Sequence, residues 1–217
     1  MRDLWAFIAD NQAQILRLLA QHVEFSLLSV ALSILIGVPL GLLCRANRII
    51  AQILLNTVSI IYTVPTLALF GLMIPLLGIG ELPAITAIVL YSLLPIVQNT
   101  YTGLLAVPAD AREAARGMGM SGLQILVRVE LPLALSLIFA GVRVATVNAI
   151  GMVTIASFIG AGGLGDLIFR GISTVSTIVV VTGSVPVLVM AIGADILLRR
   201  VETMLALKSG AEAVTRE

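Results

Sequence analysis

Long stretches without a charged residue recur along this chain, and they constrain its fold more than any other feature of the sequence. A helix that crosses a bilayer needs about 20 mostly apolar residues. The uncharged stretches that reach this length are Phe25–Cys44, Ile49–Gly80, Leu82–Ala109, Val144–Gly165 and Gly171–Ala194. The fourth extends back to Leu131 or Pro132 if Arg143, the only charge in between, is accepted within it.

Composition places these stretches in lipid. Hydrophobic residues make up 59% of the chain and charged residues 12%, a balance unlike that of soluble domains. Lipid cannot satisfy backbone donors and acceptors, and the stretches lack the alternating pattern of barrel strands. We therefore predict an all-α polytopic membrane protein with five transmembrane helices in one membrane domain.

The first 22 residues mix charges with apolar residues at helical spacing. Leu4 and Trp5 can face lipid while neighbouring acidic and amide side chains face water. We predict an amphipathic helix in the membrane interface over residues 1–22, with a cap packed on the bundle as an equal alternative. The membrane domain then spans 23–206, and 207–217 form a cytoplasmic tail.

The basic residues are divided unequally between the two sides of the predicted spans. Nine share one side: Arg45, Arg48, Arg112, Arg116, Arg128, Arg199, Arg200, Lys208 and Arg216. Three share the other: Arg2, Arg17 and Arg170. Because cytoplasmic loops carry the excess of Lys and Arg, we predict an N-terminus outside and a C-terminus in the cytoplasm.

Several kinds of chemistry are excluded by what the sequence lacks. No Gly-x-x-x-x-Gly-Lys-Ser/Thr phosphate loop occurs, so the chain should not bind ATP as a P-loop enzyme does. One histidine, His22, and one cysteine, Cys44, cannot build a zinc site or a Cys–His nucleophile pair. We expect no catalytic residue, metal site, cofactor or nucleic-acid partner for this chain.

Prolines interrupt the second and third apolar stretches. Pro65 and Pro75 should kink or break the second span and Pro95 the third, because proline removes a backbone hydrogen bond and crowds the preceding turn. Kinked helices often line a cavity, although better packing explains a kink equally well. The residues that we assign to a possible translocation path are Tyr62, Pro65, Tyr91, Gln98, Asn99 and Asn148. For the tyrosines, positions in the interface or core are the common alternative.

A polar segment separates the third and fourth apolar stretches. Pro108 suits the first turn of a helix, and acidic residues follow it near the positive end of the helix dipole. Gly119 favours a left-handed turn that ends this helix. Ser121, three residues before Gln124, has the form of a capping box that starts another. We predict a helix, a tight glycine turn and a second helix over 108–131.

This polar segment resembles the coupling loop of type I ABC-importer permeases. Its Glu113-Ala114-Ala115, Gly119, Val129 and Leu131-Pro132 fall on the spacing of that family, with Val129 where the family usually carries Ile. The resemblance implies a bacterial-type cytoplasmic (inner) membrane protein with a methionine-permease-like fold. It also implies that a separate ATPase is engaged by Glu113, Ala114, Ala115, Gly119, Leu131 and Pro132.

Nearly the whole chain is similar to the permeases of osmoprotectant importers, which carry glycine betaine, carnitine and choline. The segments that carry this resemblance are Val64–Leu72, Tyr91–Gly103, Glu113–Pro132 and Ile159–Asp166, the last shared with methionine-type permeases. The implied partners are a cytoplasmic ABC ATPase dimer that binds ATP and Mg, a second permease subunit, identical or not, and an extracytoplasmic substrate-binding protein. Substrate would move inward.

Two alternatives remain for the function and two for Arg143. The cargo of the same family could be methionine or another small polar metabolite, and a passive channel or structural subunit is a more distant possibility. Arg143 would lie about 16 Å into the fourth span and must face protein or water. We favour a structural clamp over a place on the path, because an exposed arginine would oppose a cationic substrate.

Overall fold

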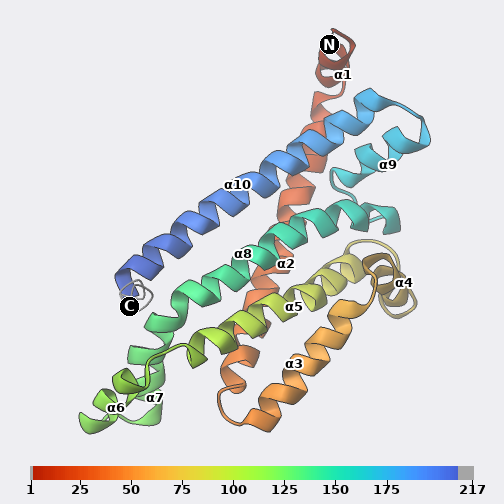
Figure 1. Cartoon of the computed structure of the whole chain (residues 1–217). Coiled ribbons are helices and arrows are strands. Elements are labelled where there is room, and N and C mark those ends of the chain that lie inside the picture. The colour runs from red at the N-terminus through yellow and green to blue at the C-terminus, as the bar shows by residue number, and fades with distance from the viewer. Residues whose placement is uncertain (1, 210–217) are drawn as a thin grey trace.

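The computed structural model describes residues 2–209, which form a bundle of helices with no strand in that range (Figure 1). The α-helices are α1 (Arg2–Asp10), α2 (Gln12–Leu43), α3 (Arg48–Thr63), α4 (Thr66–Leu77), α5 (Glu81–Leu105), α6 (Ala109–Gly117), α7 (Gly122–Ile125), α8 (Leu131–Ala156), α9 (Gly165–Ser173) and α10 (Thr177–Ser209). A π-helical segment, η1 (Leu126–Glu130), joins α7 to α8, and a 3-10 turn, η2 (Ser157–Ile159), follows α8. The predicted all-α class is confirmed.

Four long helices of the described range have the length and composition to cross a membrane. They are α2, α5, the continuous run from α7 through η2, and α10. The remaining predicted span is divided into α3 and α4, which meet at an angle of 99°. Five spans are reached only if this bent pair counts as one broken span.

Proline chemistry accounts for the break between α3 and α4. A residue that precedes proline is pushed out of the helical region, and Val64 is accordingly extended, with φ −67° and ψ 128°. The carbonyl of Val64 accepts a hydrogen bond from the Tyr91 hydroxyl, which replaces the lost helical partner. Pro75 and Pro95, in contrast, lie inside α4 and α5, so the breaks considered there do not occur.

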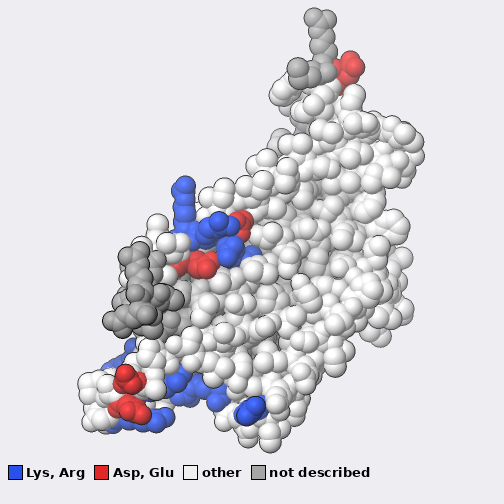
Figure 2. Space-filling model, viewed as in Figure 1, with Lys and Arg blue, Asp and Glu red and all other residues white. Residues whose placement is uncertain are grey.

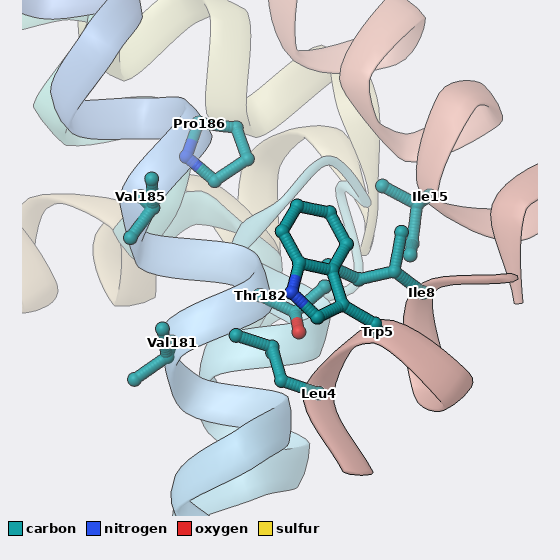
Figure 3. A pocket seen from close by; sticks show the side chains of 8 residues that line it. All are labelled: Leu4, Trp5, Ile8, Ile15, Val181, Thr182, Val185 and Pro186. Carbon is teal, nitrogen blue, oxygen red and sulfur yellow. The ribbon is translucent and has the colours of Figure 1, made fainter. Parts of the chain in front are cut away.

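The N-terminal segment differs from the single helix predicted over residues 1–22. The chain divides at Asn11, whose side-chain amide donates to the carbonyl of Phe7 at 2.9 Å, and residues 12–22 are the first turns of α2. The apolar face of α1 lies over α10, where a groove of about 330 Å³ separates the two helices. Figure 3 shows the Trp5 ring in this groove, facing Pro186.

Glycines let the three central helices approach closely. A Cβ placed on Gly41 of α2 would lie 2.5 Å from Cβ of Thr100 in α5. One placed on Gly141 of α8 would lie 2.6 Å from the carbonyl oxygen of Pro95, also in α5. Both distances are shorter than any real contact of that kind. Because lipid tails are as apolar as the helices, such close packing is what drives their association.

Helix α10 is longer than the predicted fifth span, which ended at Ala194. At 1.5 Å per residue its 33 residues extend about 50 Å, more than the roughly 30 Å hydrocarbon core of a bilayer. Residues 207–209, assigned to the tail, are its last helical residues, and residues 210–217 lie outside the described range. Helices α6 and α7 lie at the end of the bundle opposite the N-terminus (Figure 1).

Candidate functional site

The polar segment between α5 and α8 folds as predicted into a helix, a glycine turn and a second helix. Pro108 precedes the first residue of α6, and Gly119 adopts φ +77°, in the left-handed region that favours glycine. Ser121 and Gln124 form a complete capping box, with the Ser121 N–H donating to Oε1 of Gln124 at 2.8 Å. Helix α7 then continues through η1 into α8 without a break.

The loop presents part of the family pattern to solvent and buries the rest. Glu113, Ala114 and Gly119 are exposed, and a Cβ added to Gly119 would meet nothing within 4 Å. Ala115, on the opposite face of α6, is 1% exposed. The outer face of α6 thus combines small residues, which let another protein approach the backbone closely, with charged side chains such as Glu113, while Ala115 anchors the helix.

Leu131 and Pro132, the last residues of the pattern, begin α8. Leu131 packs against a buried cluster formed by Leu104, Ala134 and Ile138. Pro132 is exposed at the first turn of the helix, where its missing N–H costs nothing. These two residues therefore join the loop to the bundle rather than form part of its outer face.

A charged cluster behind the loop was missed by the sequence analysis. Glu130, the last residue of η1, has a side chain that is 2% exposed. Its carboxylate pairs with Arg45, in the turn between α2 and α3, and with Arg112 of α6, at 2.6 and 3.0 Å. The only signal in the sequence was a carboxylate in an apolar stretch, and nothing there pointed to partners so far along the chain.

Two neighbouring pockets collect most of the residues assigned to the translocation path. One, of about 330 Å³, is lined by residues that include Tyr62, Tyr91 and Asn148. The other, of about 410 Å³, is lined by residues that include Tyr62, Gln98 and Asn99. Both pockets have Tyr62 in their lining and lie between α3, α5 and α8, and we call the two together the Tyr62 groove.

Pro65 is the exception among the assigned path residues. It lies at the junction of α3 and α4 and lines neither pocket. Its contribution is indirect, since the break that it causes leaves Tyr62 near the end of α3, where the Tyr62 and Tyr91 rings lie 5.1 Å apart with their planes inclined by 46°. Two aromatic rings and three amide side chains line the Tyr62 groove together with mostly apolar residues, and no residue that lines it is charged.

Arg143 points away from the Tyr62 groove, towards α10. Its Nη1 donates to Oδ1 of Asp195 at 2.8 Å and its Nε to Oε2 of Glu202 at 2.9 Å. Asp195 also accepts from Arg199, four residues later, at 2.9 Å. The guanidinium of Arg143 is thus held by two carboxylates of α10.

His22, which the sequence analysis considered only as a missing metal ligand, is fully buried. Its Nε2 lies 3.0 Å from the carbonyl oxygen of Ile150 in α8, and its Nδ1 lies 3.3 Å from the N–H of Leu164. A carbonyl accepts and an N–H donates, so the ring is neutral with its proton on Nε2. His22 therefore links α2 to α8 and to the glycine-rich turn before α9.

The charged side chains on the face seen in Figure 2 are unevenly placed. They gather around α6 and the C-terminal half of α10, whereas the part of this face towards the N-terminal end of α10 is almost free of charge.

Comparison with known proteins agrees with this arrangement. The family model for the inner membrane component of binding-protein-dependent transport systems matches residues 33–206. The chain is 45% identical over 211 residues to an osmoprotectant import permease protein of Salmonella typhimurium, covering 95% of this chain and 98% of that protein. It is 41% identical over 198 residues to a glycine betaine/carnitine/choline transport system permease protein of Bacillus subtilis, covering 91% of each.

Solved structures show the same fold. An inward-facing MetNI methionine ABC transporter matches with a TM-score of 0.78 at 23% identity, covering 85% of this chain and 93% of that one. An amino acid ABC transporter matches with a TM-score of 0.75 at 20% identity, covering 92% and 97%. The chain therefore belongs to the family of inner membrane components of binding-protein-dependent transport systems, the permease subunits of ABC importers, which have no ATPase site of their own.

Proposed function

We propose that this permease carries quaternary-amine osmoprotectants, of the kind represented by glycine betaine, carnitine and choline, into the cytoplasm. The observation that carries the proposal is the pair of tyrosine rings in the uncharged Tyr62 groove. The names of the relatives, which are permeases for these compounds, support it.

The chemistry of the Tyr62 groove suits such a cargo. A quaternary ammonium group cannot donate hydrogen bonds, and the faces of aromatic rings attract it through cation–π interactions. Tyr62 and Tyr91 supply two adjacent rings, whose centroids lie 5.1 Å apart, so the cargo would contact them from the groove and not enter between them. The amides of Gln98, Asn99 and Asn148 can donate to the carboxylate of glycine betaine or carnitine, or to the hydroxyl of choline.

The absence of charge in the groove matters as much as the rings. A cation such as choline and a zwitterion such as glycine betaine can both pass a neutral polar surface, whereas a fixed positive charge would repel the ammonium group. Arg143 is the charge within the fourth span, and its pairing with Asp195 and Glu202 supports a structural role as a clamp between α8 and α10.

Transport requires partners that bind at the two ends of this subunit. We assign the exposed face of α6 to a cytoplasmic ABC ATPase dimer, which binds ATP and Mg. A substrate-binding protein delivers the cargo from the other side. One chain offers one such loop, so a second permease subunit, identical or not, is needed to engage the second ATPase. The proposed arrangement requires an N-terminus outside and a C-terminus in the cytoplasm.

Substitutions at Tyr62 test the assignment of the cargo. We expect Tyr62→Leu to reduce uptake of labelled glycine betaine by about five- to tenfold, the equivalent of roughly 1–1.4 kcal/mol for one cation–π contact. Tyr62→Phe keeps the ring and should retain most of the uptake. The measurement is initial uptake by cells that express each variant at an equal level in the membrane. Equal uptake by the leucine and phenylalanine variants would contradict a role of the ring.

Competition in the same assay separates the other functions. Excess choline and carnitine should compete with labelled glycine betaine, whereas methionine should not. Competition by methionine alone would favour the amino-acid cargo named for the structural neighbours. Uptake that persists after cellular ATP is depleted would favour a passive channel.

A further inference from the structure

Glu130 is a buried charged residue with no place in the groove or on the exposed face of the loop. Its side chain is 2% exposed, and it lies directly before Leu131 and Pro132. Removing a carboxylate from water is costly, and such a group persists where cations compensate it. Two arginines do so here, from segments that are distant in the sequence.

The two arginines belong to different parts of the bundle. Arg45 lies in the turn between α2 and α3, and its guanidinium contacts both carboxylate oxygens of Glu130, at 2.6 and 3.2 Å. Arg112 is on α6, and its Nε donates to Oε1 of Glu130 at 3.0 Å. Arg112 also donates through Nη2 to the carbonyl of Leu104, near the end of α5.

This cluster is the main polar attachment of α6 to the bundle. The packing of α6 within the described residues is chiefly against α7 and η1, the segments that follow it in the chain. Arg112 reaches beyond them, to α5 directly and to the α2–α3 turn through Glu130. A displacement of α6 must therefore move Glu130 and Leu104 or break these bonds.

The backbone at Glu130 also departs from a regular α-helix. Glu130 ends η1, a π-helical segment, and single π-helical turns inside α-helices occur often at functional sites. The segment leads directly into α8, which forms one wall of the Tyr62 groove through Asn148. A shift at Glu130 can thus reach the groove along one continuous helix.

We propose that Glu130, Arg112 and Arg45 form the joint that passes movement of α6 to α5, α8 and the α2–α3 turn. Glu130 is a positioning residue in this scheme, since it contacts neither the cargo nor the ATPase. The inference rests on the proposed function, because it assumes that an ATPase moves α6.

The test uses the intact complex of this permease with its partner subunits, reconstituted in proteoliposomes. The variants are Glu130→Gln, Arg112→Gln and the double variant, with Arg128→Gln as the matched control. Arg128 is an exposed arginine of the same π-helical segment. The readout is the number of glycine betaine molecules transported per ATP hydrolysed, measured beside the melting temperature and subunit stoichiometry of each complex.

Each single variant should lower the transport per ATP by about fivefold or more, while ATP hydrolysis continues. The double variant should be little worse than either single one, since both remove the same joint. The control should match the unmodified complex. Variants that melt earlier but keep the normal transport per ATP would show a merely structural role and overturn the inference.

The proposal can still be tested if the Glu130 variant fails to fold. If Glu130→Gln fails to assemble, Arg45→Gln replaces it, because the side chain of Arg45 is 38% exposed and its loss leaves Glu130 paired with Arg112. This variant should also lower the transport per ATP, and a normal value would contradict the joint. Absence of ATP-driven uptake by the unmodified complex would instead overturn the proposed function, and this inference with it.

Discussion

Replacing Glu113 with lysine, or Gly119 with tryptophan, is expected to reduce ATP-driven uptake by at least about tenfold while the protein still folds and inserts. Both residues are exposed on the loop, so neither substitution disturbs the core. Lysine reverses the charge at position 113 of the face offered to the ATPase. A Cβ added to Gly119 meets nothing within 4 Å, and the tryptophan ring beyond it would occupy the space that a docked partner needs.

The backbone of Gly119 requires a control, because its φ of +77° is unfavourable for other residues. Asparagine tolerates this region better than most side chains do, so Gly119→Asn separates backbone strain from obstruction. We expect the asparagine variant to retain much more uptake than the tryptophan variant. The measurement is uptake at equal membrane expression, together with recovery of the ATPase during purification. Normal uptake by both Glu113→Lys and Gly119→Trp would rule out this surface as the coupling contact.

Gly41→Leu should leave little or no folded protein. The new Cβ would lie 2.5 Å from Cβ of Thr100, and the rest of the leucine side chain would need space that α5 fills. Overpacking of a tight core costs about 1–3 kcal/mol or more, and here α2 and α5 would have to separate along their length. The melting temperature and the monodisperse fraction of the purified protein report the loss.

Gly193→Leu is the matched control for this prediction. Gly193 is exposed on α10, and a Cβ there meets nothing within 4 Å. Leucine also has the higher helix propensity, by up to about 1 kcal/mol, so this variant should fold as well as the original. Equal stability of the Gly41 and Gly193 variants would show that the α2–α5 contact is looser than the structure has it.

Features that depend on neighbouring residues were predictable from the sequence. Proline at position 65 acts on its own turn through its ring and its missing donor, and the break expected there is found. The turn at Gly119 and the capping box at Ser121 likewise depend on a few adjacent residues, and both were found as expected. The lengths of the uncharged stretches predicted the long helices, since the thickness of the bilayer sets the length that a spanning helix needs.

Features that depend on tertiary packing were not predictable from the sequence. The uncharged lengths gave no sign of the angle between α3 and α4, and a proline inside α5 left that helix continuous. The extension of α2 back to Gln12 depends on burial of residues such as Leu18 and His22 against other helices. Amphipathic spacing alone does not distinguish burial against protein from a position in the membrane interface.

The residues of the candidate site also divide into those that adjacent sequence predicts and those that only the fold brings together. The loop residues were found because the family pattern is local and specific. The groove residues were proposed one by one from polarity, and only the fold places Tyr62 beside residues of α5 and α8. Glu130 was missed because its partner Arg45 is 85 positions away, and no periodic or spaced motif records such a contact.

The most direct test of the account is purification of the tagged chain from its native membrane in a gentle detergent, with identification and stoichiometry of every protein recovered. The account predicts an ABC ATPase in a 1:1 ratio to permease subunits, and a second permease in the complex if the pair is not identical. Recovery of this chain alone, repeated after crosslinking in the intact membrane, would contradict the claim that it serves an ATP-driven importer.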